Sequence, residues 1–359
     1  MTTASVTELN PAKAEAFAGK MLGILNGATT ALMSSIGHRT GLFDTMSGLK
    51  PSTSTEIADA SQLNERYVRE WLGNMVTSGI VEYNPAEQTY FLPPEHAGFL
   101  TRAAGPDNMT LFCQYISLFG NVENEIVECF RHGGGVPYDR YQRFQALMAE
   151  ESAAVNDLAL IDRTLPLVPG LVARLEQGIQ VADVGCGQGH ALNLMARAFP
   201  RSHFKGYDFS EEGVAAAQAE AQAWDLDNVR FQVQDIANWH EAEVYDFITA
   251  FDTIHDQAHP TKVLQNIYTA LKPGSPFLMI DIAASSKLEE NIEHPLGPVL
   301  YTASTMHCMT VSLAYGGEGL GTAWGRQKAT EMLEAAGFHG IEVKEVEGDI
   351  LNYYYVSQK

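Results

Sequence analysis

VADVGCGQGHALNLMARAF, residues 181–199, is a short apolar run followed by three glycines at alternate positions and an amphipathic helical pattern. Asp183 lies near the end of the apolar run, and Gly185, Gly187 and Gly189 come after it. Because glycine has no Cβ, such a loop can turn sharply and approach a ligand closely, and the N–H groups at the helix start face acceptors on that ligand. This order of strand, tight loop and helix predicts a site for a nucleotide-type cofactor.

The spacing of the glycines discriminates between cofactors. A dinucleotide fingerprint requires G-x-G-x-x-G, whose third glycine allows close packing of helix on strand. Counting from Gly185, that third position holds His190. A phosphate-binding P-loop requires a Lys and a Ser or Thr after its last glycine, and no glycine cluster in this chain is followed by that pair. The spacing therefore disfavours both NAD and ATP.

The form D-x-G-x-G-x-G, from Asp183 to Gly189, resembles motif I of the class I S-adenosylmethionine-dependent methyltransferases. This resemblance implies that S-adenosyl-L-methionine is the cofactor. It also implies that the loop, including Cys186, cradles the methionine part of that cofactor.

Further strand-like runs follow at residues 203–208, 228–235, 246–252 and 276–282, and helical stretches separate them. Strands that alternate with helices predict right-handed crossovers and a mostly parallel sheet, with ligands at the carboxyl ends of the strands. An acidic residue lies near each expected end: Asp183, Asp208, Asp235, Asp252 and Asp281. The alternative is that each acid only caps the helix after its strand. The last two runs, residues 340–348 and 350–357, match the antiparallel ending typical of this methyltransferase fold.

The resemblance also implies roles for residues around the loop. In the family, an acid at the position of Asp208, followed here by Phe209, accepts both ribose hydroxyls, and the pair Asp235–Ile236 holds the adenine. Phe251, at the end of the fourth run, is expected at the same site. The segment FQALMAEES resembles a cofactor-contacting helix of plant and bacterial small-molecule O-methyltransferases. Its Phe144, Met148 and Ser152 share one helix face by their spacing, although plain core packing would explain Phe and Met equally well.

The stretch FDTIHDQAHP, residues 251–260, resembles the His-Asp-Trp segment that carries the general base of those enzymes, with Gln257 in the place of Trp. A hydroxyl acceptor must lose its proton during attack, and neutral His255 suits that task because the reference pKa of histidine is about 6.5. We expect Asp281, rather than Asp256, to orient the ring. The alternative is that His255 only satisfies backbone groups at a helix start. The family also tends to place an acid before the final helix, where this chain has Trp324-Gly325-Arg326.

Residues 290–325 form a long insertion before the last expected helix, and loops of that length usually have a function. We expect a lid over the acceptor, with Tyr301 and His307 as substrate contacts and the glycine-rich residues 316–321 as its hinge. His255, His294 and His307 could suggest a metal site, but no two of these histidines have a chelating spacing. The sequence therefore favours a lid without a metal.

The N-terminal part of the chain predicts a helical domain. Apolar residues recur at helical spacing over residues 11–37, which fits either a core helix or the seam of a homodimer. Residues 52–93 then read as helix, turn, helix and β-hairpin, a winged helix. Its segment 50–102 holds four basic residues, Lys50, Arg66, Arg69 and Arg102, against seven acidic ones, Glu56, Asp59, Glu65, Glu70, Glu82, Glu87 and Glu95. That balance argues against DNA and favours dimerisation and closure of a substrate pocket.

Composition limits the classes of protein to which this chain can belong. The chain has 359 residues, a formal net charge of −21 and four widely spaced cysteines without a metal-ligand pattern. Its first ten residues lack the charged start and apolar core of a leader, and no run of about 18 apolar residues occurs. These features predict a soluble, cytoplasmic protein that binds neither membranes nor nucleic acid.

Together these observations predict an α/β protein. A helical winged-helix domain over residues 1–170 would serve dimerisation and substrate capping. A Rossmann-like methyltransferase domain over residues 171–359 would hold a mostly parallel seven-stranded sheet with an antiparallel C-terminal strand. The expected activity is methyl transfer to a small organic hydroxyl compound, with His255 as the base. Nitrogen, sulfur or carbon acceptors without a protein base, and a ligand-responsive regulator, stay open as alternatives.

Overall fold

The computed structural model describes residues 9–359, which divide into two compact units, one ending at Ser117 and the other spanning Leu118–Lys359. These units are defined by packing alone. The boundary expected at residue 170 therefore stays a prediction about the division of function. The predicted absence of a leader rests largely on residues 1–8, which lie outside the described part of the chain. No helix within residues 9–359 combines the length and apolarity needed to cross a membrane.

The first unit is the predicted winged helix. Its elements are α1 (Pro11–Arg39), α2 (Leu42–Ser47), α3 (Ser54–Ser61), α4 (Glu65–Thr77), β1 (Glu82–Asn84), β2 (Thr89–Phe91) and α5 (Pro94–Ala97), and α6 (Thr110–Gly120) continues into the second unit. Thr53 and Glu56 form a reciprocal capping box that starts α3, and the Asn64 side chain caps α4. Phe43 and Trp71 pack edge to face in the core that α2, α3 and α4 share. The hairpin β1–β2 is antiparallel and forms the wing.

Helix α1 is not an internal core helix over its N-terminal part, where every side chain up to Thr29 is exposed. Large apolar residues stand on that exposed surface at helical spacing, among them Phe17, Met21 and Leu25, which are 62%, 47% and 60% exposed. Buried positions begin only at Ser34, near the C-terminal end of the helix. Within its own unit, this stretch of α1 is therefore not a core helix.

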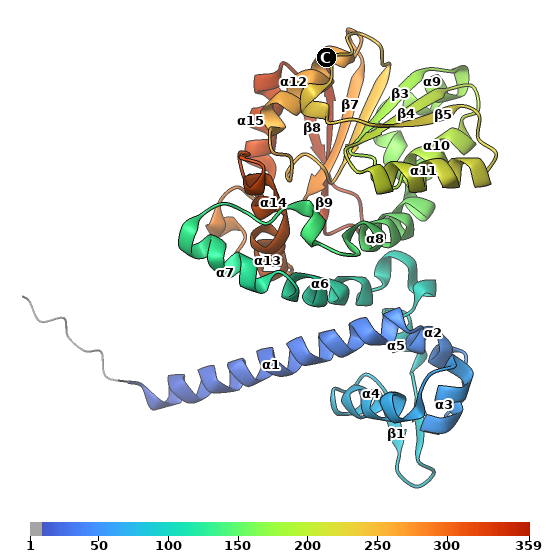
Figure 1. Ribbon diagram of the computed structural model, residues 1–359, viewed down its shortest axis with the longest axis vertical. Coiled ribbons are helices and arrows are strands. Elements are labelled where there is room, and N and C mark those ends of the chain that lie inside the picture. The colour runs from blue at the N-terminus through green and yellow to red at the C-terminus, as the bar shows by residue number, and fades with distance from the viewer. Residues whose placement is uncertain (1–8) are drawn as a thin grey trace, which may run out of the picture. The chain divides into compact units, whose positions relative to one another are not determined.

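The second unit is built on a seven-stranded sheet. Its strands are β3 (Gln180–Val184), β4 (His203–Asp208), β5 (Val229–Val233), β6 (Phe247–Phe251), β7 (Pro276–Ile282), β8 (His339–Lys344) and β9 (Asn352–Gln358). Their order is β5-β4-β3-β6-β7-β9-β8, with β3 to β7 parallel and β9 antiparallel to both of its neighbours (Figure 1). The predicted mostly parallel sheet with its antiparallel C-terminal strand is confirmed.

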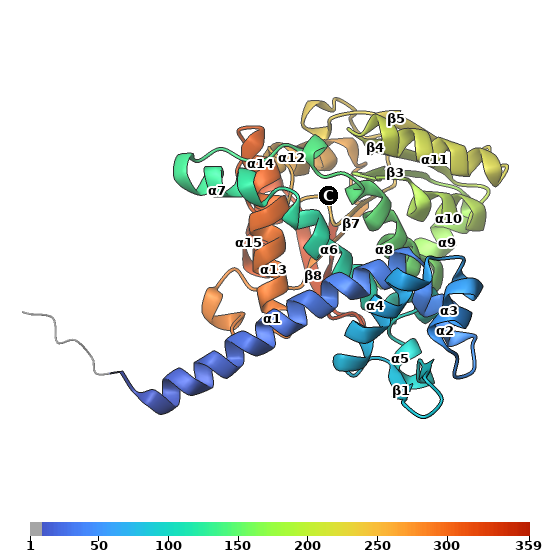
Figure 2. The same ribbon diagram turned by 60° about the horizontal axis from the view of Figure 1, so that its bottom comes forward.

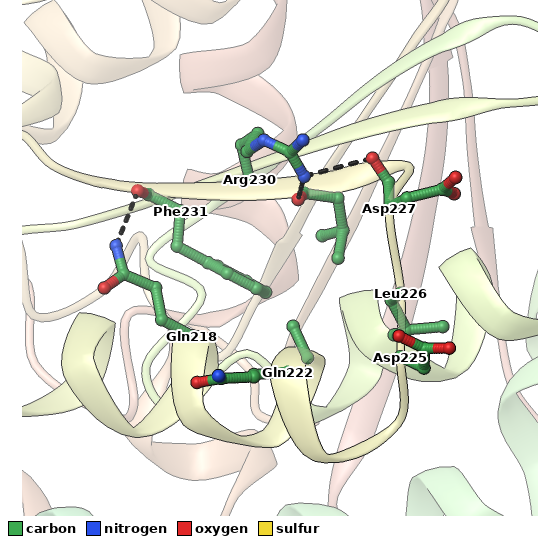
Figure 3. A pocket seen from close by; sticks show the side chains of 9 residues that line it. Gln218, Gln222, Asp225, Leu226, Asp227, Arg230 and Phe231 are labelled. Carbon is green, nitrogen blue, oxygen red and sulfur yellow. Dashed lines mark hydrogen bonds between the residues drawn. The ribbon is translucent and has the colours of Figure 1, made fainter.

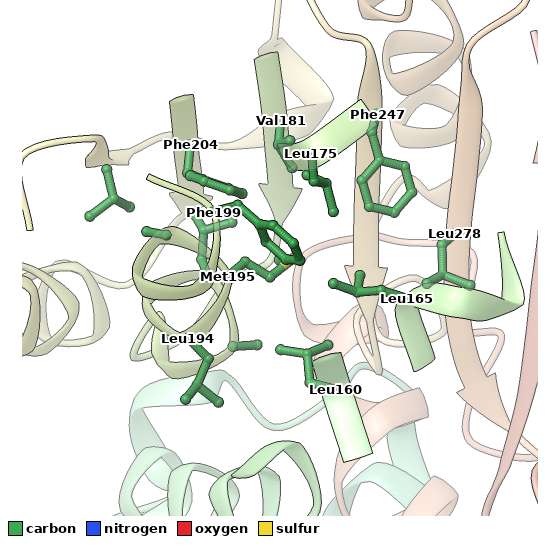
Figure 4. Packing of buried hydrophobic residues seen from close by; sticks show 14 of the residues in the cluster. Leu160, Leu165, Leu175, Val181, Leu194, Met195, Phe199, Phe204, Phe247 and Leu278 are labelled. Carbon is green, nitrogen blue, oxygen red and sulfur yellow. The ribbon is translucent and has the colours of Figure 1, made fainter. Parts of the chain in front are cut away.

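Helices cover both faces of this sheet. The helices of the second unit are α7 (Glu123–His132), α8 (Phe144–Ala159), α9 (Leu171–Gln177), α10 (His190–Ala198), α11 (Glu211–Ala223), α12 (Pro260–Ala270), α13 (Gly297–Ala303), α14 (Met309–Ala314) and α15 (Gly325–Ala336). Buried side chains of α9, α10 and α11 form one core with the sheet, and those of α12 and α15 form a second (Figure 2). In the first core, Met195 of α10 and Phe199, the residue after that helix, pack toward Val181 and Phe204 of the sheet (Figure 4). These two cores hold the sheet rigid beneath its carboxyl edge.

The strand order reverses between β3 and β6. After β3 the chain winds outward through β4 and β5, and it then returns to the other side of β3 as β6. In open sheets of this kind, the crevice outside the strand ends at such a reversal is where ligands bind. The glycine loop after β3 and the histidine segment after β6 therefore lie at the same crevice.

Candidate cofactor and acceptor site

The glycine loop is tightly packed on one side. Gly185 has a φ of +70°, and a Cβ added there would lie 2.0 Å from the hydroxyl oxygen of Thr253, just after β6. Gly187 differs, because a Cβ there would meet only Gln145, with its Oε1 3.8 Å away. The loop thus presses against the protein at Gly185 and leaves space at Gly187. This open backbone, at the start of α10, fits the cradle that the sequence predicts for a cofactor.

Asp208, at the end of β4, ties this loop to the neighbouring strand. Its two carboxylate oxygens accept hydrogen bonds from the backbone N–H groups of Gly187 and Ser210, both at 2.8 Å. Burial raises the pKa of Asp208, and these N–H donors oppose that rise. A carboxylate offers about four acceptor sites, so Asp208 keeps capacity for further donors such as a pair of hydroxyls. Phe209, the next residue, remains about half exposed.

Asp183 and Cys186 support the loop from within the fold. Thr249 donates a hydrogen bond of 2.7 Å to Asp183, whose carboxyl is buried, and burial raises its pKa to about 7. The thiol of Cys186 lies so close to Gly206 of β4 that a Cβ on that glycine would come within 2.9 Å of the sulfur. Burial raises the pKa of the Cys186 thiol. Asp183 therefore ties β3 to β6, and Cys186 packs against β4. The predicted contacts of both residues with a cofactor stay predictions.

Asp235 caps the short helical turn that follows β5. Its carboxylate accepts hydrogen bonds from the backbone of Ala237 at 2.9 Å and from the side chain of Asn238 at 2.7 Å. Ile236 is buried beside it. The helix-capping alternative for this acid is therefore correct as a local role. The predicted adenine contact of Asp235 and Ile236 stays a prediction.

His255 and Asp281 form a buried pair at the ends of β6 and β7. His255 Nδ1 lies 2.8 Å from Asp281 Oδ1, and the two residues are 5% and 0% exposed. The same oxygen accepts hydrogen bonds from the indole N–H of Trp324 at 3.0 Å and from the backbone N–H of Ile282 at 2.8 Å. The structure therefore brings together the two residues that the sequence singled out as base and orienting acid. With the proton on Nδ1, the second nitrogen, Nε2, is left as the basic atom.

The protonation of His255 is set by opposing effects. Burial lowers the pKa of His255, but the charge of Asp281, the interaction with Cys308 and the hydrogen bond to Asp281 together raise it well above its ordinary value. Cys308 thus lies against the same ring as Asp281 does.

Trp324 is the residue at this site that sequence reasoning missed. It stands just before α15, where the related enzymes tend to carry an acid, and it is 4% exposed. Its indole N–H stabilises the negative charge on Asp281, whereas an acid there would act on the histidine. The departure from the family pattern was visible in the sequence, but its consequence required knowing that α15 starts beside the end of β7.

An aromatic group lies over this region. His307 stacks on Phe144 with ring centroids 3.8 Å apart, and Tyr138 and Tyr141 approach the His307 ring edge-on at 5.6 and 4.6 Å. Tyr138 also meets Phe209, beside the cofactor loop, at 5.2 Å. The predicted cofactor residue Phe144 and the predicted substrate residue His307 are therefore in direct contact. Met148 lies one turn further along α8 and is half buried.

Other predicted residues are placed differently. Phe251 ends β6 and packs against the first hydrophobic core. Tyr301 is joined to the histidine and aromatic group by no hydrogen bond or ring contact in residues 9–359; its hydroxyl instead accepts a hydrogen bond from Asn291 at 3.0 Å. The glycine-rich turn packs closely, since Gly321 N–H donates to the backbone oxygen of His255 at 3.2 Å. Within residues 9–359, no group of three His, Cys, Asp or Glu side chains is arranged to hold a metal ion.

The charges around this site are acidic. Burial raises the pKa of Asp252 to about 8, and the nearby charge of Asp281 adds to that rise. Burial likewise raises the pKa of Asp256 to about 6. Asp252 has a left-handed φ of +48°, and its Oδ1 is buried without a hydrogen-bond partner in the described residues. The site therefore concentrates carboxyl groups beside the one histidine pair.

A surface pocket of about 370 Å³ lies elsewhere, between the end of α11 and the start of β5. Figure 3 shows Gln218, Gln222, Asp225 and Arg230 around it, and Arg230 donates to backbone oxygens of its own strand region. This pocket is near the amino end of β5, opposite to the carboxyl edge where ligands bind in such sheets. It holds none of the predicted site residues.

Comparisons with known proteins agree with this architecture. Residues 28–102 match the Rv2258c-like winged HTH domain, and residues 175–337 match a methyltransferase domain. The malonyl-[acyl-carrier protein] O-methyltransferase of Bacillus cereus is 28% identical over 142 residues, which are 39% of this chain and 46% of that protein. The trans-aconitate 2-methyltransferase of Variovorax paradoxus is 32% identical over 116 residues, 32% of this chain and 42% of that protein. The chain thus spans less than half the length of these relatives.

Solved structures extend the similarity to nearly the whole chain. Mitomycin 7-O-methyltransferase has a TM-score of 0.71 at 16% identity, covering 98% of this chain and 100% of that one. Human N-acetylserotonin methyltransferase, solved in complex with S-adenosylmethionine, has a TM-score of 0.67 at 16% identity and covers 99% of both chains. The predicted fold and both predicted domain types are therefore confirmed: the chain carries a winged helix-turn-helix domain ahead of a methyltransferase domain.

Proposed function

We propose that this protein transfers a methyl group from S-adenosyl-L-methionine to a hydroxyl group of a small organic acceptor, with His255 as the general base. The observation that carries this proposal is the buried His255–Asp281 pair at the carboxyl edge of the sheet. It lies one strand away from the glycine loop that would hold the cofactor. When bound, S-adenosyl-L-methionine supplies a methyl carbon on a positively charged sulfur that is an excellent leaving group.

The residues that would hold the cofactor surround the open side of the loop. The backbone at Gly187 leaves the space, and the carboxylate of Asp208 keeps acceptor capacity for ribose hydroxyls. We assign Asp235 and Ile236 to the adenine and Phe144, Met148 and Phe251 to the remaining contacts, as the family pattern implies. We assign Asp183, Gly185, Cys186 and Gly189 to the same cofactor cradle, as the family pattern implies.

The protein's own part in the reaction is alignment and proton removal. The acceptor oxygen has to lie in line with the methyl carbon and the sulfur. As the new carbon–oxygen bond forms and the carbon–sulfur bond breaks, the hydroxyl proton passes to His255 Nε2. Asp281 then stabilises the resulting imidazolium through its contact with Nδ1. A general base of this kind contributes typically about 10²–10⁴-fold to the rate.

Replacing His255 by Ala and by Gln tests the proposal. We expect the rate of methyl transfer to fall by about 10²–10⁴-fold, while the affinity for S-adenosylhomocysteine, measured by calorimetry, stays unchanged. An acceptor nitrogen, sulfur or carbon would need no such base, so a rate preserved in both variants would overturn the hydroxyl assignment. Absence of any uptake of S-adenosyl-L-methionine or S-adenosylhomocysteine by the wild-type protein would overturn the enzyme assignment itself.

We further propose that α1 pairs with a second copy of the chain. Its exposed apolar residues follow one another at helical spacing over more than four turns, from Phe17 to Ile36. A soluble helix with such a stripe needs a partner surface. Replacing Leu25 by Glu would convert a dimer to a monomer in light scattering, with Lys20→Gln on the same helix as a control that changes the net charge by the same amount. A wild-type monomer at micromolar concentration would contradict this assignment.

The winged helix is proposed to serve this assembly and the substrate pocket rather than DNA. Both arginines of α4 are already engaged with acids of the same helix, Arg66 with Glu70 and Arg69 with Glu65. Phosphate binding would have to compete with those pairs in a chain of net charge −21. Salt-dependent binding to mixed-sequence duplex DNA would reveal the alternative role of a regulator.

A further inference from the structure

Two side chains of the insertion enter the site from one irregular helical turn. Between α13 and α14 the chain forms a π-helical turn, Ser304–Cys308, whose last two residues are His307 and Cys308. Both are buried, at 1% and 9% exposure. Cys308 contacts the His255 ring, and His307 stacks on Phe144. Single π-helical turns recur at functional sites because the extra residue re-aims side chains.

His307 is the unusual member of this pair. Neither of its ring nitrogens, Nδ1 or Nε2, has a hydrogen-bond partner in the described residues, although the ring is buried. Buried polar atoms are almost always hydrogen-bonded, and each one left without a partner costs about 1–3 kcal/mol. Phe144 covers one face of the ring, so partners must approach the ring edge. We therefore expect a ligand group to supply the missing hydrogen-bond partners of these nitrogens.

The charge state of His307 determines which ligand groups can pair with its ring nitrogens. Burial, together with the charge of His255, lowers the pKa of His307 to about 3. His307 is therefore neutral at physiological pH and offers one N–H donor and one acceptor nitrogen. A hydroxyl group both donates and accepts, so it can satisfy either nitrogen. A carboxylate can only accept, so it can pair with the N–H of the ring but never with the acceptor nitrogen.

The charges around the site also favour an uncharged acceptor over a carboxylate. The strongest electrostatic influences on Tyr138, Asp252 and Asp256 come from carboxyl groups and from His255. Once His255 is neutral, as a base must be, an anionic acceptor would enter this acidic, buried region without a compensating cation, which is costly. The walls around His307 are the rings of Tyr138, Tyr141 and Phe144. Such walls fit a flat, uncharged molecule.

We propose that the acceptor is an uncharged aromatic compound with two hydroxyl groups, one facing His255 for methylation and the other hydrogen-bonded to His307. This inference rests on the proposed hydroxyl methylation and narrows its substrate class. His307 acts here as a specificity-determining residue, while His255 remains the base. Phenolic acceptors with one hydroxyl and aromatic carboxylates are correspondingly poor ligands.

The test uses the full-length protein saturated with S-adenosylhomocysteine, and it measures binding separately from methyl transfer. Calorimetry would compare catechol, resorcinol and hydroquinone, whose two hydroxyls differ in spacing, with phenol and benzoate. For the wild-type protein we expect at least one diol to bind about tenfold more tightly than phenol, the gain of one well-made hydrogen bond. We expect no measurable binding of benzoate. The diol that binds best reports the spacing between His255 and His307.

Variants of His307 test whether its imidazole ring causes the preference for a diol over phenol. In His307→Phe, which keeps the stack on Phe144, the preference for the diol over phenol should disappear. His307→Asn and His307→Gln offer a polar group near the position of either ring nitrogen, and at least one of them should retain part of the preference. His294→Phe, the same exchange elsewhere in the insertion, should leave the preference intact, because His294 only accepts a hydrogen bond from its neighbour Leu296.

Distinct results would overturn the inference. Equal binding of phenol and all three diols, tighter binding of benzoate, or an undiminished diol preference in His307→Phe would each contradict it while the proposed methyl transfer stands. Failure of the wild-type protein to take up S-adenosylhomocysteine would instead contradict the proposed function, and this inference with it.

Discussion

The cofactor side and the acceptor side of this site are built in different ways. The cofactor loop is one contiguous segment, from Asp183 to Gly189, and its neighbour Asp208 ends the next strand. The acceptor side combines His255, Asp281, His307 and Trp324, which come from four separate segments of the chain. A site formed by one continuous segment can be recognised from the spacing of its residues in the sequence. Assembled geometry depends on how distant segments pack, and it is also where the chain departs from its family's pattern.

The largest effect should come from breaking the contiguous side at Gly185. In Gly185→Ala, the new Cβ would clash with Thr253 and the residue would have to keep a left-handed φ. We expect a loss of about 3 kcal/mol or more in unfolding free energy and no measurable binding of S-adenosylhomocysteine. Thermal unfolding and calorimetry would measure both. Gly187→Ala, where the space is open, is the matched control and should cost only about 1 kcal/mol.

A Gly185→Ala protein that binds S-adenosylhomocysteine as tightly as the wild type would show that the loop is not the cofactor cradle.

The assembled side is tested next by Asp281→Asn. The base must be neutral to act, and Asp281 helps to hold the pKa of His255 well above its ordinary value. The wild-type rate should therefore rise with pH, and the midpoint of this rising limb should lie above pH 6.5. Removing the charge lets burial lower the pKa, so the limb of Asp281→Asn should move to lower pH, with a rate loss of about 10²-fold. Profiles of kcat/KM against pH would check this.

Asp246→Asn is the control for that experiment, since Asp246 pairs with Lys272 away from the site. An unmoved limb in Asp281→Asn would contradict the role of Asp281 as the orienting acid.

A smaller effect should appear in stability at Asp252, which lies between the two sides. Its folded pKa of about 8 is raised above the unfolded value of about 3.9. The folded state therefore holds a proton that the unfolded state loses, and this contribution to stability declines as pH rises from about 4 to 8. Asp252→Asn removes the titration, and Asn tolerates the left-handed φ. We expect the variant to gain about 2–3 kcal/mol over the wild type at pH 8.5 relative to pH 5.5.

Chemical unfolding at the two pH values would measure this difference. Parallel stabilities of wild type and variant across that range would show that Asp252 is ionised in the folded protein.

The smallest effect is expected at Tyr301. Its hydroxyl bonds to Asn291 and has no link to the His255 and His307 group. Tyr301→Phe should therefore change kcat/KM by less than about threefold and cost about 1 kcal/mol of stability, the value of one hydrogen bond. Steady-state kinetics would check it. A large loss of activity would restore Tyr301 as a substrate contact.

Much of the fold was predictable because its signals are local. Alternation of apolar runs with helical stretches identified every strand of the second unit, and β4 and β7 have the predicted bounds. The winged helix followed from caps and a hairpin turn, which are also local. What the spacing of apolar residues in α1 could not decide was whether they face a core or solvent. Periodicity reports that a face is apolar and says nothing about what covers it.

By itself the sequence determined the glycine loop, the acids at the strand ends, and the identity of the histidine and aspartate that form the buried pair. Only the tertiary structure decided that Trp324 donates to Asp281, that Asp235 serves as a cap, and that His307 rather than Tyr301 joins the aromatic group. The physical reason is range. Backbone conformation and periodicity act over a few residues, whereas a hydrogen bond between residues 43 positions apart exists only once the sheet has brought β7 beside the start of α15.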